Sequence, residues 1–284
     1  MQTRVIAPLN QKVVPEILEV EITSRFQIPS FTVVGLADRE VGEARERVRA
    51  AIEASGWEFP QRKIVINLSP ADVRKSGTGL DLPMALAVLL ESSPIPGPPK
   101  TFCAWGELGL DGKVRSAGHV LRTLHAAWAA KADAVLLPRD DSQAAASALE
   151  LLHRAGFIAR YGPPPRLQLL KKLSDWREVL SLAKAPSHVG DLLHRAPTTT
   201  AETHEENDLP LPILLGQAVG LAVAGLHHLY LVGPRGSGKS TAVDALARLL
   251  PPLSPVQELT RGLLQDLAPS SCDSVRVVRV GQTV

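Results

Sequence analysis

The residues best suited to chemistry lie in one short loop near residue 235. Gly233, Gly238, Lys239 and Ser240 fit the pattern G-x-x-x-x-G-K-[ST], in the segment GPRGSGKS. Glycines at these positions let backbone N–H groups turn towards phosphate oxygens, and a lysine and a hydroxyl at this spacing reach the terminal phosphates and a Mg²⁺ ion. The pattern therefore predicts binding of ATP, or a similar nucleoside triphosphate, together with Mg²⁺.

We expect Lys239 to contact the β- and γ-phosphates and the Ser240 hydroxyl to ligate the metal. Arg235 lies inside the loop and is either a phosphate contact or an exposed loop arginine. No catalytic residue is predicted. The predicted nucleotide-binding residues are the loop and the start of the next segment: Gly233, Pro234, Arg235, Gly236, Ser237, Gly238, Lys239, Ser240 and Thr241.

Such a loop needs a strand before it and a helix after it. The apolar run at 228–232 predicts the strand, and Lys239 to Leu250 predicts a helix that ends at a proline pair. An apolar segment from Ile213 to Gly225 predicts a further helix. Together they indicate a C-terminal α/β module that starts near residue 209.

The first 161 residues alternate strand-like and helix-like patterns at short intervals, which favours a compact α/β or α+β domain. Strands are predicted at Ile64, Ile66 and Leu68, which repeat at period two, and at 32–34 and 134–137. Helices are predicted over 39–55, 81–91, 118–131 and 141–155. The fold class expected for the whole chain is α/β.

A turn-rich segment, Gly162 to Pro165, separates the two parts. A helix is predicted from Leu167 to Ala183, and 185–212 is polar and rich in Pro and Thr, as in a linker. The expected organisation is a first domain over 1–165, a helix and linker over 166–208, and a second domain over 209–284.

Composition sets further limits on function. The net charge of +2 and pI of about 8.6 are weakly basic and do not by themselves demand a nucleic-acid partner. Cys103 and Cys272 show neither metal-ligand spacing nor a disulfide framework, which fits a reducing compartment. The first residues have no apolar core of a signal peptide, and no apolar run reaches membrane-spanning length. A cytoplasmic location is therefore expected.

Several specific segments occur together: VVGL at 33–36, EARERVR at 43–49, INLSPAD at 66–72, the G-x-x-x-D-L-P-x-A-L pattern at 77–86, and a histidine pair before the loop. GELGLDGKVRSAG, from Gly106 to Gly118, adds to them. With these motifs the chain resembles the ComM/YifB group of magnesium-chelatase-like AAA+ ATPases, over nearly all residues to about Pro255.

The resemblance implies an N-terminal domain similar to the proteolytic domain of Lon, followed by an AAA+ module. Relatives assemble as ATP-driven homo-oligomeric rings, often hexameric, and the best understood role is DNA branch migration during natural transformation. The chelatase name reflects kinship of the ATPase and does not imply metal insertion. ATP, Mg²⁺, further copies of the chain and DNA are thus the implied ligands and partners.

Two departures from the family pattern stand out. The Lon-type nucleophile position falls at Gly79 and the lysine position at Leu121, so proteolysis is not expected. Lys75 and Ser76 nearby are interpreted as solvated polar groups. The acidic motif, sensors, arginine finger and lid of relatives are not found in the roughly 45 residues after the loop, and the late strand candidate 274–280 carries arginines instead.

We therefore expect nucleotide binding with no hydrolysis by this chain alone. The alternative is a non-enzymatic oligomerisation or interaction module with a vestigial loop. Gly216 and Gln217 are weak candidates for an adenine pocket, and His227 and His228 are interpreted as structural. A basic cluster is either a DNA-facing patch or a solvated face: Arg45, Arg47, Arg49, Arg62, Lys63, Arg74 and Lys75. The tryptophans are interpreted as core or interface anchors: Trp57, Trp105, Trp128 and Trp176.

Overall fold

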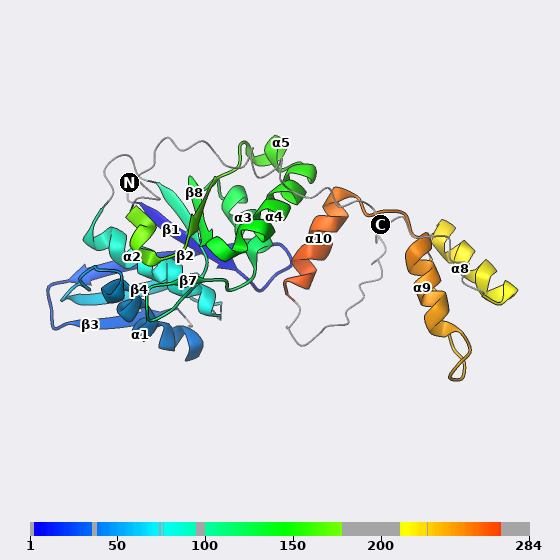
Figure 1. Cartoon of the computed structure of the whole chain (residues 1–284), viewed down its shortest axis with the longest axis horizontal. Helices are drawn as coiled ribbons and strands as arrows, with labels where there is room; N and C mark the ends of the chain where they lie inside the picture. Colours follow the sequence, from blue (N-terminus) through cyan, green and yellow to red (C-terminus); the bar gives the residue numbers. More distant parts are fainter. Residues whose placement is uncertain are drawn as a thin grey trace. The chain divides into compact units, whose positions relative to one another are not determined.

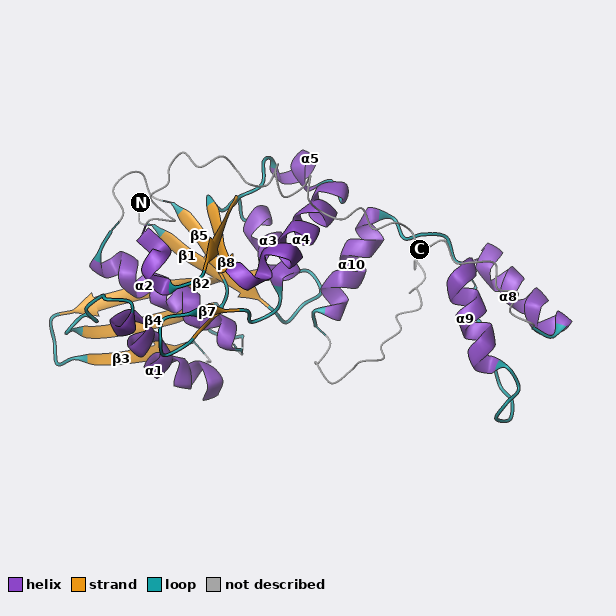
Figure 2. Cartoon of the chain, viewed as in Figure 1, coloured by secondary structure: helices purple, strands orange, loops and turns teal. Residues whose placement is uncertain are grey.

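The structure, a computed structural model, describes the chain over residues 3–35, 39–73, 75, 77–94, 100–177, 211–225 and 227–267. Strands and helices are mixed along the chain, which confirms the α/β class (Figure 2). The chain divides into two compact units, Met1–Ala196 with Pro255–Pro269, and Pro197–Ser254 with Ser270–Val284. None of the helices within the described ranges is long and apolar enough to cross a bilayer.

A seven-stranded sheet, in the order β3-β4-β2-β1-β5-β8-β9, forms the centre of the first unit (Figure 1). Strand β2 runs antiparallel to both β1 and β4, and the other neighbours are parallel. Strands β6 (Glu107–Leu108) and β7 (Val114–Arg115) make a separate short ribbon. The sheet strands are β1 (Arg4–Leu9), β2 (Glu16–Arg25), β3 (Ser30–Val34), β4 (Lys63–Ser69), β5 (Thr101–Ala104), β8 (Ala134–Pro138) and β9 (Arg166–Leu170).

Helices pack on this sheet in pairs, α1 with α2 and α3 with α4, and both α2 and α3 contact the central strands β1, β2 and β5. The helices of the first unit are α1 (Arg39–Ala54), α2 (Asp81–Ser92), α3 (Val120–Ala129), α4 (Ser142–Arg154), α5 (Phe157–Tyr161) and α10 (Pro255–Gln265). Short 3₁₀ turns are η1 (Thr78–Leu80), η2 (Arg139–Asp141) and η3 (Leu173–Asp175). The second unit contains α8 (Ile213–Gly225) and α9 (Lys239–Leu249), which pack on each other.

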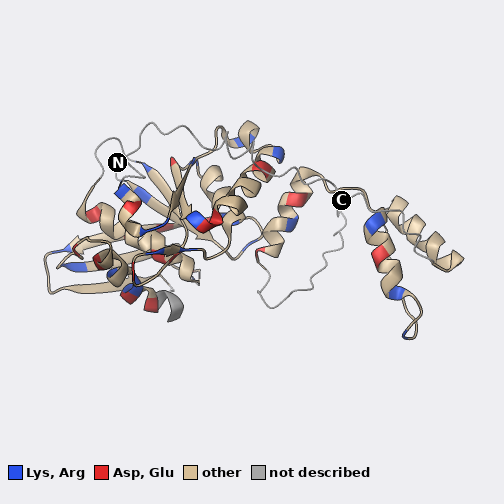
Figure 3. Cartoon of the chain, in the orientation of Figure 1, with Lys and Arg blue, Asp and Glu red and all other residues tan. Residues whose placement is uncertain are grey.

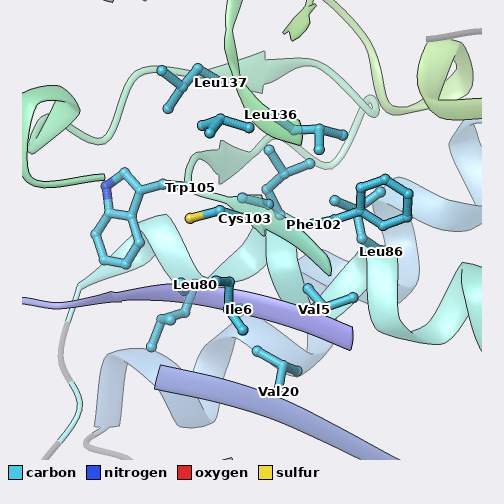
Figure 4. Packing of buried hydrophobic residues seen from close by; sticks show 14 of the residues in the cluster. Val5, Ile6, Val20, Leu80, Leu86, Phe102, Cys103, Trp105, Leu136 and Leu137 are labelled. Carbon is cyan, nitrogen blue, oxygen red and sulfur yellow. The ribbon is translucent and has the colours of Figure 1, made fainter. Parts of the chain in front are cut away.

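Figure 4 shows the part of the core that lies between the central strands and α2, and residues of α3 and α4 belong to the same cluster. Phe102 on β5 and Leu86 on α2 are fully buried, because parallel central strands are covered on both faces. Trp105, Trp128 and Trp176 are also buried, and Trp57 packs edge-on against Trp176 with ring centroids 5.7 Å apart. The interpretation of the tryptophans as core anchors is confirmed for these residues.

The predicted helix over Leu167 to Ala183 is wrong. Residues Arg166–Leu170 form β9, which pairs in parallel with β8 and completes one edge of the sheet, and a 3₁₀ turn follows. The preceding prolines favour an extended conformation at the start of the segment. Backbone pairing with β8 then makes these residues a strand. The boundary expected at residue 165 therefore falls before the last strand of the sheet. Residues 178–183 lie outside the described ranges.

The strand predicted at 228–232 is also wrong. These residues run as irregular chain without a β-ladder, and the side chains of Tyr230 and Val232 are 90% and 79% exposed. A strand exists only where a neighbour pairs with it, and the described residues of this unit form helices and loops alone. The late strand candidate at 274–280 lies outside the described ranges.

Helix α10 packs on α3 and α4, although it follows the second unit in sequence. Leu259 and Leu263, one helical turn apart, are buried in this contact, and Arg154 forms an ion pair with Glu258 at 2.7 Å. The fully buried Arg122 donates to the Leu263 carbonyl at 3.0 Å. Segment 255–269 thus belongs to the first unit.

A buried ion pair joins α1 to the start of α2. The fully buried Asp81 carboxylate accepts bonds from Arg47 Nε and Nη2, at 2.7 and 3.0 Å, and from the backbone N–H of Leu108 at 3.2 Å. Burial raises the pKa of the Asp81 carboxyl, and the hydrogen bonds from Arg47 oppose that rise. Arg47 therefore neutralises the buried Asp81 carboxylate, which would be strongly destabilising in the core without a partner.

We expect Arg47→Met to lower the free energy of unfolding by about 3 kcal/mol near neutral pH, because the Asp81 carboxylate stays buried without its partner. Removing Arg47 should raise the pKa of Asp81 further, so the loss should shrink on acidification as the carboxyl becomes neutral. Urea denaturation at several pH values measures this effect. The control is Arg49→Met, which removes an exposed pair with Glu53 and a cation–π contact with Phe59 but leaves no buried charge, so it should change much less. A loss that does not depend on pH would contradict the role given to Asp81.

Candidate functional site

The loop between residue 232 and α9 has the backbone conformation that its glycines predict. Gly236 and Gly238 adopt positive φ angles of 83° and 81°, and Gly238 is the left-handed N-cap residue of α9. The first helical hydrogen bond runs from Ala242 N–H to Gly238 C=O, at 2.9 Å. The N–H groups at the start of the helix are therefore not used by its own ladder and remain suited to an anion.

The Lys239 ammonium lies across this loop. It donates to the carbonyl oxygens of Gly233 and Pro234, at 2.7 and 2.6 Å, and to the Ser237 hydroxyl at 3.2 Å. An ammonium has three protons, so these acceptors match its full hydrogen-bonding capacity. A positive charge is thus held in the loop, and a phosphate oxygen would replace one or more of these neutral acceptors with a charged one.

A hollow of about 470 Å³ adjoins the loop. Its volume lies in the range of small-molecule sites. Ser240 and Asp244 stand four residues apart on α9 and so lie on the same face of the helix. Asp244 was not predicted from the sequence, although this spacing was a signal that could have identified it. The lining residues are Leu229, Leu231, Lys239, Ser240, Val243 and Asp244.

These features fit a triphosphate with Mg²⁺. The free N–H groups and Lys239 suit phosphate oxygens, while a hydroxyl and a carboxylate at the rim of the hollow are the oxygen ligands that Mg²⁺ prefers. Arg235 is exposed, as expected of a solvated loop residue, and Thr241 is half-buried. The structure thus brings the predicted loop residues together at one helix terminus.

Helix α8 lies beside the loop. A Cβ atom placed on Gly238 would be 3.9 Å from a Leu215 methyl carbon, and Gly216 and Gln217 follow on the same helix. Gln217 is exposed. The assignment of these two residues to an adenine pocket stays a prediction. His227 and His228 are exposed, and no set of three or more His, Cys, Asp or Glu side chains in the described ranges is placed to hold a metal ion.

The predicted basic cluster does not form a single patch. Arg47 is paired with Asp81 and Arg49 with Glu53, and Figure 3 shows basic and acidic residues interspersed over the first unit. The interpretation of Lys75 as solvated is wrong: it is 1% exposed, its ammonium donates to the Pro70 carbonyl, and burial lowers its pKa. Arg62 and Lys63 are exposed. Arg74 and Ser76 lie outside the described ranges.

The position expected for a peptidase nucleophile is filled by another side chain. A Cβ atom on Gly79 would lie 2.1 Å from Cε2 of the buried Trp105 ring. Leu121, at the expected base position, is half-buried and packs against the core. Gly79 has no side chain that could act as nucleophile, and the Leu121 side chain cannot act as a base.

Comparison with known proteins places these two regions in one family. Residues 18–141 match the family model "Subunit ChlI of Mg-chelatase", and residues 215–274 match "Magnesium chelatase, subunit ChlI". The second match contains the loop, helices α9 and α10, and all but the first two residues of α8. The chain is related to the magnesium-chelatase ChlI family. The resemblance inferred from the sequence motifs is thereby confirmed.

Individual relatives of this ChlI-type chain extend over most of its length. It is 33% identical over 270 residues to YifB of Salmonella typhimurium, an uncharacterised protein, covering 92% of this chain and 48% of that protein. It is 30% identical over 267 residues to YifB of Escherichia coli, with the same coverage. It is 28% identical over 237 residues to the competence protein ComM of Haemophilus influenzae, covering 81% and 43%. The chain thus spans about half the length of the curated relatives it matches.

Proposed function

We propose that this ChlI-type chain binds ATP with Mg²⁺ at residues Gly233 to Thr241, as the nucleotide-binding part of a magnesium-chelatase-like AAA+ protein. The observation that carries the proposal is the Lys239 ammonium, held over a loop with two left-handed glycines at the N-terminus of α9. A positive charge, free N–H groups and a helix dipole then act on the same anion.

Each residue has a separate part in this proposal. Lys239 binds the β- and γ-phosphates, and the glycines allow the backbone to approach the phosphate oxygens closely. Ser240 ligates Mg²⁺, and Asp244 lies near enough along α9 to orient the metal or its water shell. The metal, when bound, neutralises charge on the phosphates. The proposal covers binding and assigns no residue to hydrolysis.

The wider role that we propose is DNA processing by a homo-oligomeric ring. One relative is named a competence protein, and the resemblance of the motifs to the ComM/YifB group implies a DNA motor. In this proposal the assembled ring, and not the single chain, acts on DNA. The weakly basic charge of the chain neither requires nor opposes this role.

The second unit offers a direct test, because most of its described side chains are exposed to solvent or only half-buried. Saturating MgATP should protect segment 211–250 from limited proteolysis and raise the melting temperature of that unit, since a ligand that binds only the folded state stabilises it by about 2.7 kcal/mol at 100 times its Kd. Magnesium without nucleotide is the control. Cleavage of this segment at the same rate with and without MgATP would contradict the proposal.

One observation favours a second candidate function, an interaction module with a vestigial loop. Residues 228–232, which should form the strand before the loop, pair with no strand among the described residues and expose Tyr230 and Val232. Under this alternative the first unit mediates oligomerisation and the second unit does not bind nucleotide. Proteolysis that leaves an intact first unit, with unchanged oligomeric state and no effect of MgATP, would select it.

A further inference from the structure

One end of the sheet in the first unit presents an unusual pair of apolar side chains. Phe26 and Ile28, in the connection between β2 and β3, are each 87% exposed. The strand register places Arg25 and Ser30 both opposite Lys63, so this connection passes over the beginning of β4. We call residues 25–28 the tip.

The tip is held in place rather than loose. Gln27 N–H donates to the Arg25 carbonyl at 2.8 Å, and Ser30 N–H donates to the Arg62 carbonyl at 3.3 Å. The Arg62 guanidinium carbon lies 4.3 Å from the centroid of the Phe26 ring. An exposed side chain that is already ordered loses little entropy when a partner covers it, which favours an interface.

A hollow of about 360 Å³ lies beside the tip. Arg62 lines the hollow and also contacts Phe26, so hollow and tip are neighbours on the same surface. Glu58 is exposed at the hollow, and Glu91 accepts a hydrogen bond from the Ser24 hydroxyl at 2.6 Å. The apolar lining residues are Ile22, Pro60, Ile64 and Val88.

The tip and the hollow match in size and, at Arg25 and Glu58, in charge. The hollow has room for one large apolar side chain and is lined by Glu58, Glu91 and Arg62, while the tip carries the Phe26 ring and Arg25. Within the described residues Arg25 and Glu58 form no ion pair, so both are available to a partner, whereas Arg62 already contacts the Phe26 ring. A surface that carries both a projection and the site that fits it is self-complementary.

We propose that the tip docks into the hollow of a second copy of this chain. Because both features lie on one face, a two-fold axis lets each copy place Phe26 in the hollow of the other and pair Arg25 with Glu58 across the interface. The contact is small and belongs to the weak, reversible class of interfaces. It uses the first unit alone and does not depend on nucleotide binding.

Sedimentation velocity of the full chain, at concentrations up to about 200 µM, tests the contact. The wild-type chain should associate reversibly, and Phe26→Ser combined with Ile28→Ser should raise the dissociation constant at least about 10-fold. Leu110→Ser is the control, because Leu110 is 64% exposed on the β6–β7 turn and should leave association unchanged. Melting curves confirm that each variant is folded.

A charge exchange tests the two-fold arrangement. Arg25→Glu and Glu58→Arg should each weaken self-association, because like charges then face each other twice. A mixture of the two variants should associate as well as wild type, since both cross-pairs become opposite in sign. A wild-type chain that stays monomeric, tip variants that associate normally, or a mixture that fails to associate would each overturn the proposal. Lys239→Ala should associate like wild type, which separates this inference from the nucleotide site.

Discussion

Replacing Lys239 by alanine should raise the dissociation constant for MgATP about 10- to 100-fold, because one or two charge-assisted hydrogen bonds to phosphate are lost. The ammonium already lies in the loop, held by the carbonyls of Gly233 and Pro234, so the fold places it without help from the ligand. Isothermal titration with MgATP gives the affinities of wild type and variant.

The matched control is Arg235→Ala. This arginine carries the same charge within the same loop but is exposed. Its removal should change the dissociation constant by a few-fold at most, through the field of the charge alone. Equal losses for Lys239→Ala and Arg235→Ala would mean that binding reflects general positive charge and not a specific site.

Gly79→Ser should destabilise the first unit by about 3 kcal/mol without creating peptidase activity. The new Cβ would lie 2.1 Å from the Trp105 ring, and the Gly79 carbonyl is fixed by the Gly106 N–H at 2.9 Å. The buried indole therefore has to move, which disrupts a packed core. Leu121 would still provide no base for the serine.

Tryptophan fluorescence during urea denaturation measures this loss, because all four tryptophans lie in the first unit. Gly220→Ala is the control: nothing lies within 4 Å of its Cβ position, on α8 of the second unit, so the fluorescence transition should not change. A stable Gly79→Ser variant would show that Trp105 does not block this position. Cleavage of a casein substrate by that variant would contradict the exclusion of proteolysis.

Local sequence patterns predicted those helices and strands in which apolar residues recur at a regular spacing. The alternation of Ile64, Ile66 and Leu68 identified β4, and helical spacing identified α1 and α2 with ends within one or two residues. Strands β1, β2 and β5 were not predicted; β1 and β2 pair as neighbours in sequence, but β1 also pairs with β5 and β2 with β4, which lie far along the chain. Pairing also explains the two wrong elements: β9 formed where β8 offered a partner strand, and 228–232 pairs with no strand in the part of the chain that the structure describes.

The candidate site was predictable because its chemistry depends on residue types within one short loop. The motif alone identified Lys239, Ser240 and the glycines, and the left-handed angles of Gly236 and Gly238 follow from their lack of a Cβ. The burial of a side chain by segments distant in sequence was not predictable. Lys75 was interpreted as solvated, since nothing beside it in the sequence shows that other segments cover it.

Hydrogen exchange with and without MgATP is the most direct test of the central claim, that the Gly233–Thr241 loop binds nucleotide. Backbone amides from Gly236 to Thr241, which are not bonded within α9, should exchange more slowly when phosphate oxygens accept from them. The core amides of β1 and β5 should be unaffected. Unchanged exchange across the loop at saturating MgATP would contradict the account.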